Sequence, residues 1–329
     1  MKLPQPIQYQ GSKRLLAPFI LRYLPADTAR LIEPFAGTGA VSIACAARGV
    51  VRKFWLNDLN RPLIELLRMI AQTPDAIADF YEEIWTQQAE DTLEHYYRVR
   101  EDFNRTRDPR LFLYLLARCV KGAVRYNSDG HFNQSPDKRR RGTRPETMRQ
   151  NIFAVFALLG GRTRFTHLDY REILAKADSD DVIYMDPPYQ GVCGERDSRY
   201  FAGIGFDDFV DALVSLNQRN IAYLVSYDGR RGGRQFGHKL PDYLDLTLIE
   251  LDAGRSSQAT LLGRDEITVE SLYLSPALVR RLDVTPENHT LRPNEQLRLL
   301  ETPHEHAQTA KGTARPVRVS YRKASKNGH

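Results

Sequence analysis

The spacing of apolar residues predicts a chain in which helices and short strands alternate. Near the N-terminus, apolar residues at 15, 16, 19, 20 and 23 recur at the spacing of one helix face, and Pro25 ends this predicted helix. The next predicted elements are a strand at 31–35, a glycine turn at 36–39, a helix at 40–48 and a strand at 53–56. This order is typical of a unit whose ligand lies at the carboxyl end of a parallel sheet.

A long helical segment then interrupts the alternation. Residues 62–116 are predicted to be mostly helical, with a break at Asp108-Pro109. Strand patterns return at 163–167, 182–185, 222–226 and 246–251, with a helix at 206–220. We therefore predict an α/β protein whose catalytic sheet domain comprises residues 1–60 and 161–275, with an inserted, mainly helical domain at 61–160. Residues 276–329 are predicted to form a weakly ordered basic tail.

Composition narrows the class of protein. Hydrophobic residues make up 42% of the chain and charged residues 27%, which is typical of a soluble globular protein. The chain lacks both a membrane-length apolar run and a signal-peptide pattern, so we expect no membrane contact and a cytoplasmic location. The cysteines Cys45, Cys119 and Cys193 form no Cys-x-x-Cys pair, and no metal site is predicted.

The net charge of +6 is unevenly distributed. Residues 98–149 contain fourteen basic and six acidic residues, and residues 304–329 contain six and one, so the rest of the chain is acidic. A basic segment inserted in an acidic body indicates binding to a polyanion such as nucleic acid. A merely solvated charged surface is the alternative interpretation.

The glycine turn and the acidic residues around it indicate a ligand site. Gly37 and Gly39 let the backbone turn sharply and approach a ligand, but a third glycine of the dinucleotide fingerprint is missing. Glu33, just before the turn, favours a cationic ligand. Asp58 ends the next strand, where it can accept hydrogen bonds from ribose hydroxyls or cap the following helix.

The strongest signal is Asp186-Pro187-Pro188-Tyr189, which follows an apolar strand pattern. Prolines have no N–H group, so this loop presents carbonyl acceptors beside the Asp186 carboxylate and suits an amino group as donor. The Tyr189 ring can stack on a planar base. The structural alternative is a proline turn with a capping aspartate.

In these motifs and in their order, the chain resembles the alpha group of DNA adenine methyltransferases. The likeness extends from Ile7 to about Ser275, and Tyr9 stands where many members have Trp. The matching motifs are Tyr9-Gln10-Gly11-Ser12-Lys13, Pro34-Phe35-Ala36-Gly37-Thr38-Gly39, Asp58, the Asp186 to Tyr189 segment, and Arg125, Tyr126, Asn127, Gly130, Phe132 and Asn133 of a recognition core.

The resemblance implies a Rossmann-like S-adenosylmethionine methyltransferase sheet and a target-recognition insertion with a hairpin around Asp129-Gly130. The implied reaction transfers a methyl group from S-adenosylmethionine to N6 of adenine in double-stranded DNA, with the base flipped out. The implied catalytic residues are Asp186, Pro187, Pro188 and Tyr189. The implied cofactor-binding residues are Tyr9, Gly11, Lys13, Glu33, Phe35, Gly37, Gly39, Asp58, Asp169 and Asp186.

Two of these assignments have a structural alternative. Asp169 could equally cap the helix that follows it, and Asn127 could equally form a turn. The residues implied to contact DNA are Arg125, Asn127, Asn133, Lys138, Arg139, Arg140, Arg141 and Arg144.

Two rival functions are methylation of an amino group on RNA, cytosine or protein glutamine, and a catalytically silent DNA-binding homologue. Motif order disfavours the first, and intact Lys13, Asp58 and Asp186 disfavour the second. The resemblance leaves open whether the enzyme has a restriction endonuclease as a partner in function, not necessarily bound, or acts without one. It implies a nucleoid-associated protein of a prokaryote or one encoded by a phage or mobile element.

Overall fold

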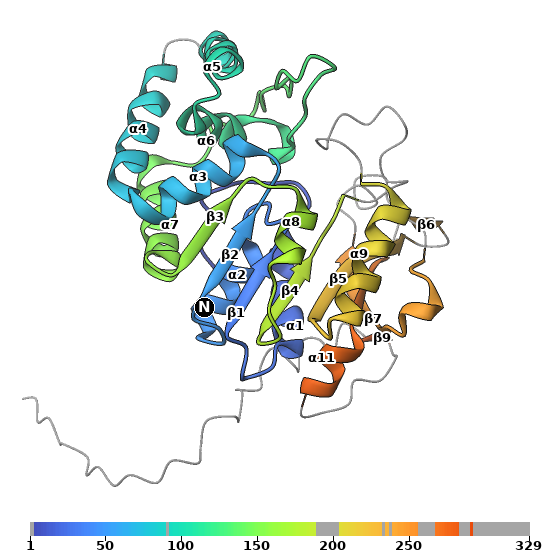
Figure 1. The fold of residues 1–329 in the computed structure, drawn as a ribbon. Coiled ribbons are helices and arrows are strands. Elements are labelled where there is room, and N and C mark those ends of the chain that lie inside the picture. Colours follow the sequence, from blue (N-terminus) through green and yellow to red (C-terminus); the bar gives the residue numbers. More distant parts are fainter. Residues whose placement is uncertain are drawn as a thin grey trace, which may run out of the picture.

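One mixed sheet of nine strands organises the part of the chain that the structure describes (Figure 1). This computed structural model describes residues 3–89, 92–188, 204–231, 234–236, 239–255, 267–282 and 290–291. The strand order is β3-β2-β1-β4-β5-β8-β7-β9, and β6 pairs with β5. The strands are Arg30–Glu33 (β1), Phe54–Asn57 (β2), Thr163–Thr166 (β3), Asp181–Met185 (β4), Ala222–Arg231 (β5), Arg234–Phe236 (β6), Thr247–Arg255 (β7), Ile267–Leu274 (β8) and Thr290–Leu291 (β9).

The first five strands pair in parallel, and their order reverses at β1. β1 pairs with β2 on one side and with β4 on the other. The chain therefore adds β2 and β3 on one side of β1, and then β4 and β5 on the other side. In open α/β sheets a ligand crevice forms at such a point, outside the carboxyl ends of the strands. The predicted α/β class is confirmed, and the glycine turn, Asp58 and Asp186 all follow strands at this edge.

Helices cover both faces of the sheet and build the segment inserted between β2 and β3 (Figure 1). They are Ala17–Ile20 (α1), Ala40–Arg48 (α2), Arg61–Gln72 (α3), Pro74–Thr86 (α4), Thr92–Thr106 (α5), Pro109–Arg118 (α6), Pro145–Leu159 (α7), Tyr170–Ala175 (α8), Phe206–Gln218 (α9) and Pro276–Arg281 (α11). None of the described helices is long and apolar enough to cross a membrane.

Alternate residues of the central strands enter two separate cores. Leu31 of β1 packs in a cluster with α1 and α2, whereas its neighbour Ile32 packs in a cluster with α8 and α9. This alternation follows from the pleat of a strand, in which successive side chains point to opposite faces. The sheet is therefore covered on both faces, as parallel sheets usually are.

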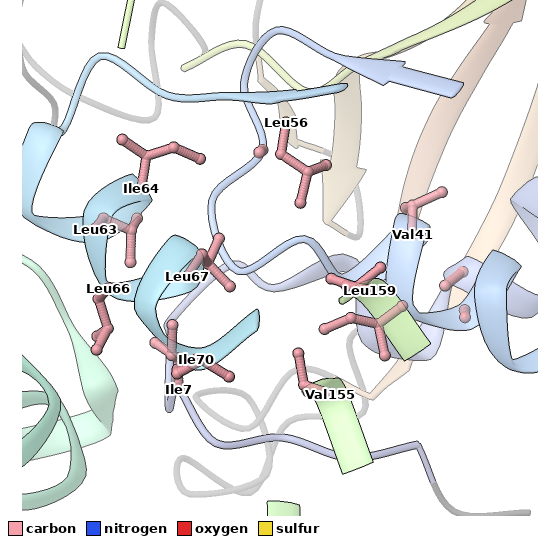
Figure 2. Close-up of a cluster of buried hydrophobic side chains, with 14 of the residues drawn as sticks. Ile7, Val41, Leu56, Leu63, Ile64, Leu66, Leu67, Ile70, Val155 and Leu159 are labelled. Carbon is pink, nitrogen blue, oxygen red and sulfur yellow. The ribbon is translucent and has the colours of Figure 1, made fainter. Parts of the chain in front are cut away.

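The inserted helices share a core with the sheet. Figure 2 shows Leu67 and Ile70 of α3 near Val155 and Leu159 of α7, together with Leu56 of β2. All five residues are buried in the same cluster. The first and last helices of the insertion are thus packed onto the sheet domain, which holds the segment between them in a defined position.

The single helix predicted before Pro25 is wrong. Residues 13–23 form the short helix α1 between two 3-10 turns, Lys13–Leu15 and Leu21–Tyr23. Pro18 lies in the first turn of α1 and has no N–H to donate to the carbonyl of Arg14. An α-helix that ran from the polar turn through this position would lose that hydrogen bond and be kinked or broken there.

Several C-terminal elements do not appear among the predicted ones, and β8 and α11 are the longest of them. The strand β8 pairs with both β5 and β7 in antiparallel orientation. The helix α11 lies at the start of the predicted tail and buries Leu278 completely. Residues beyond Leu291 lie outside the described residues.

Candidate active site

Glu33 ends β1 and is almost completely buried, with 2% of its surface exposed. Its Oε1 accepts a hydrogen bond from the Ser42 amide at 2.8 Å and another from the Ser42 hydroxyl, and neither bond uses Oε2. Burial raises the pKa of Glu33 to about 7, against the effect of the Ser42 hydrogen bonds. This predicted cofactor residue therefore also satisfies a backbone amide in the first turn of α2.

The two glycines of the turn meet different surroundings. Both have left-handed backbone conformations, with φ of 51° at Gly37 and 65° at Gly39. A Cβ atom on Gly39 would lie 3.1 Å from Leu56 Cδ1, so the buried Leu56 side chain would have to shift by a few tenths of an ångström to admit it. A Cβ atom on Gly37 would face only the Tyr9 ring, at 3.9 Å. Gly37 is therefore the glycine that keeps space open beside a predicted cofactor residue.

Asp58 holds the glycine turn from the neighbouring strand. Its two carboxylate oxygens accept hydrogen bonds from the Gly37 amide at 2.8 Å and from the Asn60 amide at 2.9 Å. Desolvation raises the pKa of Asp58, against the lowering by these two amides. The N-cap of α3 is Asn60, so the alternative that Asp58 caps this helix is wrong.

Two aromatic rings, from residues that follow β1 and β3, lie close together. The Phe35 and Tyr170 ring centroids lie 5.3 Å apart. The Tyr170 hydroxyl is buried and has no hydrogen-bond partner among the described residues. Asp169, just before Tyr170, is the N-cap of α8 and accepts a hydrogen bond from the Arg171 amide, as the structural alternative predicted. The Arg171 guanidinium also lowers the pKa of Asp169.

Asp186 follows β4 and lies beside two other charged groups. The Lys13 ammonium nitrogen lies 3.0 Å from Asp186 Oδ1 and 3.2 Å from Glu270 Oε2. Pro187 and Pro188 continue the chain at this edge, whereas Tyr189 lies outside the described residues. Glu270 was not among the predicted site residues, because β8 was not predicted and no motif surrounds it.

The N-terminal motif bridges the glycine turn and the insertion. The Ser12 and Thr38 hydroxyl oxygens lie 3.2 Å apart, and the Gln10 amide donates to the Gly122 carbonyl at 3.0 Å. A Cβ atom on Gly122 would lie 2.8 Å from the Gln8 carbonyl carbon, so only glycine allows this contact. Gly11, with φ of 91°, makes the intervening turn.

The segment around Asp129-Gly130 is an irregular antiparallel loop. Single bridges join Tyr126 to Phe132 and Cys119 to Pro136, and none of the described residues here forms a regular strand. The side-chain oxygen of Asn127 accepts hydrogen bonds from the Asp129 and His131 amides at 3.0 and 2.8 Å. The structure therefore shows the turn-forming alternative for Asn127.

This loop has a buried side and an exposed side. Tyr126 and Phe132 are buried, and Phe132 packs against Phe103 of α5 and Phe112 of α6. Asn104 holds the Phe132 backbone through two hydrogen bonds. Arg125 and Asn133 lie at alternating positions and are exposed. The loop thus exposes two of the predicted DNA-contacting residues, while the buried side chains and the Asn104 hydrogen bonds on its other side hold its backbone in place.

The basic cluster Lys138, Arg139, Arg140 and Arg141 is also exposed, as is Arg144. The backbone of the segment that carries these residues accepts hydrogen bonds from buried side chains elsewhere in the insertion. Arg118 is 1% exposed, and its guanidinium donates to the Asp137 and Arg140 carbonyls. Gln88 donates to the Arg141 carbonyl at 3.1 Å, and Tyr81 to the Thr143 carbonyl at 2.6 Å. Sequence reasoning missed Arg118, since it looks like one more surface arginine in a basic segment.

Comparisons with known proteins agree with these motifs. Residues 9–231 match the family model of the D12 class N6 adenine-specific DNA methyltransferases. The chain is 30% identical over 282 residues to a DNA adenine methylase of Vibrio cholerae, covering 83% of this chain and 96% of the relative. It is 33% identical over 189 residues to the DNA adenine methylase of Serratia marcescens, covering 56% and 66%. The match to the Escherichia coli K12 DNA adenine methylase is 31% over 187 residues, covering 56% and 64%.

The family model covers the glycine turn, Asp58, the insertion and Asp186, and thus every element assembled at this edge of the sheet except the start of the N-terminal segment and Glu270. The rival targets, RNA, cytosine and protein glutamine, do not fit this family. The chain belongs to the D12 class of N6 adenine-specific DNA methyltransferases.

Proposed function

We propose that this methyltransferase binds S-adenosylmethionine at the carboxyl ends of β1, β2 and β3, and that Asp186 holds the amino group of the target adenine. The observation that carries the proposal is the convergence of three acidic residues, Glu33, Asp58 and Asp186, on one edge of the sheet. The charge of Asp186 contributes to the raised pKa of Glu33, so the predicted cofactor and target residues are close enough to interact electrostatically.

The residues present fit this cofactor. Gly37 leaves space beside Tyr9, and the paired rings of Phe35 and Tyr170 offer an apolar surface to the cofactor's purine. Tyr170 also carries a buried hydroxyl without a described partner, as expected where a ligand completes the site. Asp58 offers acceptors to ribose hydroxyls.

The remaining cofactor assignments follow the family motifs. Glu33 faces a cationic amino group, and Asp169 accepts from the purine amino group. Tyr9, Gly11, Gly39 and Lys13 complete the set, with Lys13 at the boundary to Asp186. S-adenosylmethionine supplies an electrophilic methyl group when it is bound.

The chain's own contribution to the reaction is to hold the target amino group in position. The Asp186 carboxylate and the Pro187 carbonyl accept its two hydrogens, which turns the nitrogen lone pair toward the methyl donor and stabilises the charge that develops on nitrogen. The amino group of adenine is paired and stacked in a duplex, so the base has to leave the helix to reach these acceptors. Pro188 keeps the loop extended, and Tyr189 stacks on the extruded base.

The insertion binds double-stranded DNA. Arg125 projects from the exposed side of the loop and reads a base edge, while Lys138, Arg139, Arg140, Arg141 and Arg144 contact phosphates. Asn133 lies on the same exposed side as Arg125 and contributes to the same contact surface. Base contact by Asn127 stays a prediction, because its side-chain oxygen is engaged within the loop.

The test is transfer of tritiated methyl from S-adenosylmethionine to unmethylated plasmid DNA, with sequencing of the modified bases to identify the target. The Asp186→Ala variant should lose methyl transfer and retain cofactor binding at reduced strength, because the carboxylate acts chiefly on the target amino group. Asp180→Ala is the matched control, since Asp180 is an exposed acid just before the opposite end of β4. Near-normal turnover in Asp186→Ala would remove Asp186 from the reaction.

A further inference from the structure

Glu270 brings a second carboxylate to the ammonium that contacts Asp186. The side chains of Lys13, Asp186 and Glu270 are 10%, 21% and 24% exposed, so all three charges are largely removed from water. They come from the N-terminal segment, the end of β4 and the strand β8. One lysine therefore lies between two acids that the fold has brought together.

The antiparallel direction of β8 explains how Glu270 reaches this edge. Parallel strands β4 and β5 deliver their carboxyl ends to the site, and β8 runs in the opposite direction beside β5, so it delivers its N-terminal half. The pairing of β5 with β8 shifts register between Ser226 and Gly229, next to the position where Glu270 lies opposite Gly229. Such irregularities re-aim side chains near functional sites.

Among the residues that the structure describes, the contact between Lys13 and Glu270 leaves the carboxylate oxygen without a hydrogen bond. Glu270 Oε2 is buried and has no hydrogen-bond partner within the described residues, although the Lys13 nitrogen lies 3.2 Å away. The contact is thus an ion pair without hydrogen-bond geometry. A buried acceptor in this condition is destabilising until a donor turns toward it.

We propose that Glu270 is a positioning residue for methyl transfer, which takes over the Lys13 ammonium when Asp186 engages the target amino group. This inference rests on the proposed role of Asp186. An amino group that donates to Asp186 competes with Lys13 for the same carboxylate. Rotation of the ammonium toward Glu270 releases that carboxylate and gives Oε2 its missing donor. The lysine stays paired throughout, so no unpaired charge is left in the site.

The test compares the full-length Glu270→Gln, Glu270→Asp and Glu250→Gln variants in steady-state methylation of unmethylated plasmid DNA. Glu250 is the matched control, because it is a partly buried glutamate on the adjacent strand β7. We expect Glu270→Gln to lower kcat by about tenfold or more, with KM for DNA and the dissociation constant of S-adenosylmethionine within about twofold of the wild-type values. Glu270→Asp should restore most of kcat, and Glu250→Gln should resemble the wild type.

The other outcomes overturn the inference. An unchanged kcat in Glu270→Gln would show that Lys13 leaves Asp186 without this partner. Parallel losses of kcat, cofactor affinity and thermal unfolding midpoint, with no restoration by aspartate, would show that Glu270 only supports the fold. Asp186→Asn separates this inference from the proposed function: activity in that variant contradicts the role of Asp186 itself, whereas an inactive Asp186→Asn with a normal Glu270→Gln contradicts only the role of Glu270.

Discussion

The Lys13 ammonium and the Asp186 carboxylate form an ion pair, with 3.0 Å between Nζ and Oδ1. Lys13 belongs to the N-terminal motif, whose backbone is also bonded to the insertion through Gln10 and Gly122. Asp186 belongs to the loop after β4. This ion pair thus joins the segment that contacts the insertion to the residue proposed to hold the target base. A displacement of Lys13 therefore acts directly on Asp186.

Substitution of Gly37 separates a ligand effect from backbone strain. Gly37→Ala and Gly49→Ala both place a Cβ atom on a left-handed residue, with φ of 51° and 67°, and neither Cβ meets a close contact. Each variant should lose about 1 to 2 kcal/mol of unfolding free energy. Only Gly37→Ala should weaken binding of S-adenosylhomocysteine, by at least about tenfold, since its Cβ enters the space beside Tyr9. Calorimetric titration checks this, and equal affinities in both variants would place the cofactor elsewhere.

Glu33 should make stability depend on pH. Burial raises its pKa from the ordinary value of 4.5 to about 7, so between these values the folded protein binds a proton that the unfolded chain has lost. The unfolding free energy should therefore fall as pH rises from 5 to 8. Relative to Glu33→Gln, this fall should be about 2 to 3 kcal/mol. Urea unfolding at both pH values measures it.

Glu172→Gln serves as the control for this pH effect, because Glu172 is an exposed glutamate in the first turn of α8. The opposite slope, with wild-type stability rising relative to Glu33→Gln between pH 5 and 8, would mean that Glu33 is preferentially ionised in the folded protein.

The basic cluster can be tested through the salt dependence of DNA binding. If Lys138, Arg139, Arg140 and Arg141 contact phosphates, changing all four to Gln should flatten the slope of log affinity against log salt by about three to four units. Sequence preference should persist, because phosphate contacts carry no base information. Fluorescence anisotropy over a salt series measures the slope.

Changing Arg48, Arg52 and Lys53 to Gln is the matched control, since these exposed basic residues lie before β2, away from the carboxyl edge. If the cluster and control variants give the same slope, the cluster is a solvated loop rather than a phosphate-binding one.

Arg118 should determine the stability of the segment that carries the basic cluster. Arg118→Met removes the donor from the Asp137, Arg140 and Thr92 carbonyls and should reduce the unfolding free energy by about 3 kcal/mol. DNA affinity should fall as well, although the substituted side chain is buried. Arg110→Met should cost less, about 1 kcal/mol, because its ion pair with Asp108 is partly exposed to water. Similar losses in the two variants, measured by urea unfolding, would show that the carbonyl contacts of Arg118 contribute little.

The local sequence was sufficient to predict the elements at the carboxyl edge of the parallel strands. Strands such as β1 and β4 are short apolar runs. The glycine turn follows β1, and the double proline follows β4. These signals lie within a few residues of one another, so they can be detected without knowing the fold. The single helix predicted before Pro25 was wrong because of Pro18. This proline interrupts the backbone hydrogen bonding of a helix but leaves the spacing of the apolar residues unchanged.

The sequence by itself thus determined the α/β class, the family and the acids that follow the parallel strands. Tertiary structure decided which side chains meet. Asp58 accepts from Gly37, Arg118 holds the carbonyls of the basic segment, and Glu270 shares Lys13 with Asp186. Each of these contacts joins residues distant in the chain, and no local pattern marks an arginine as buried or a strand glutamate as facing the site. Burial and proximity are properties of the packed sheet and its insertion, and only the folded chain defines them.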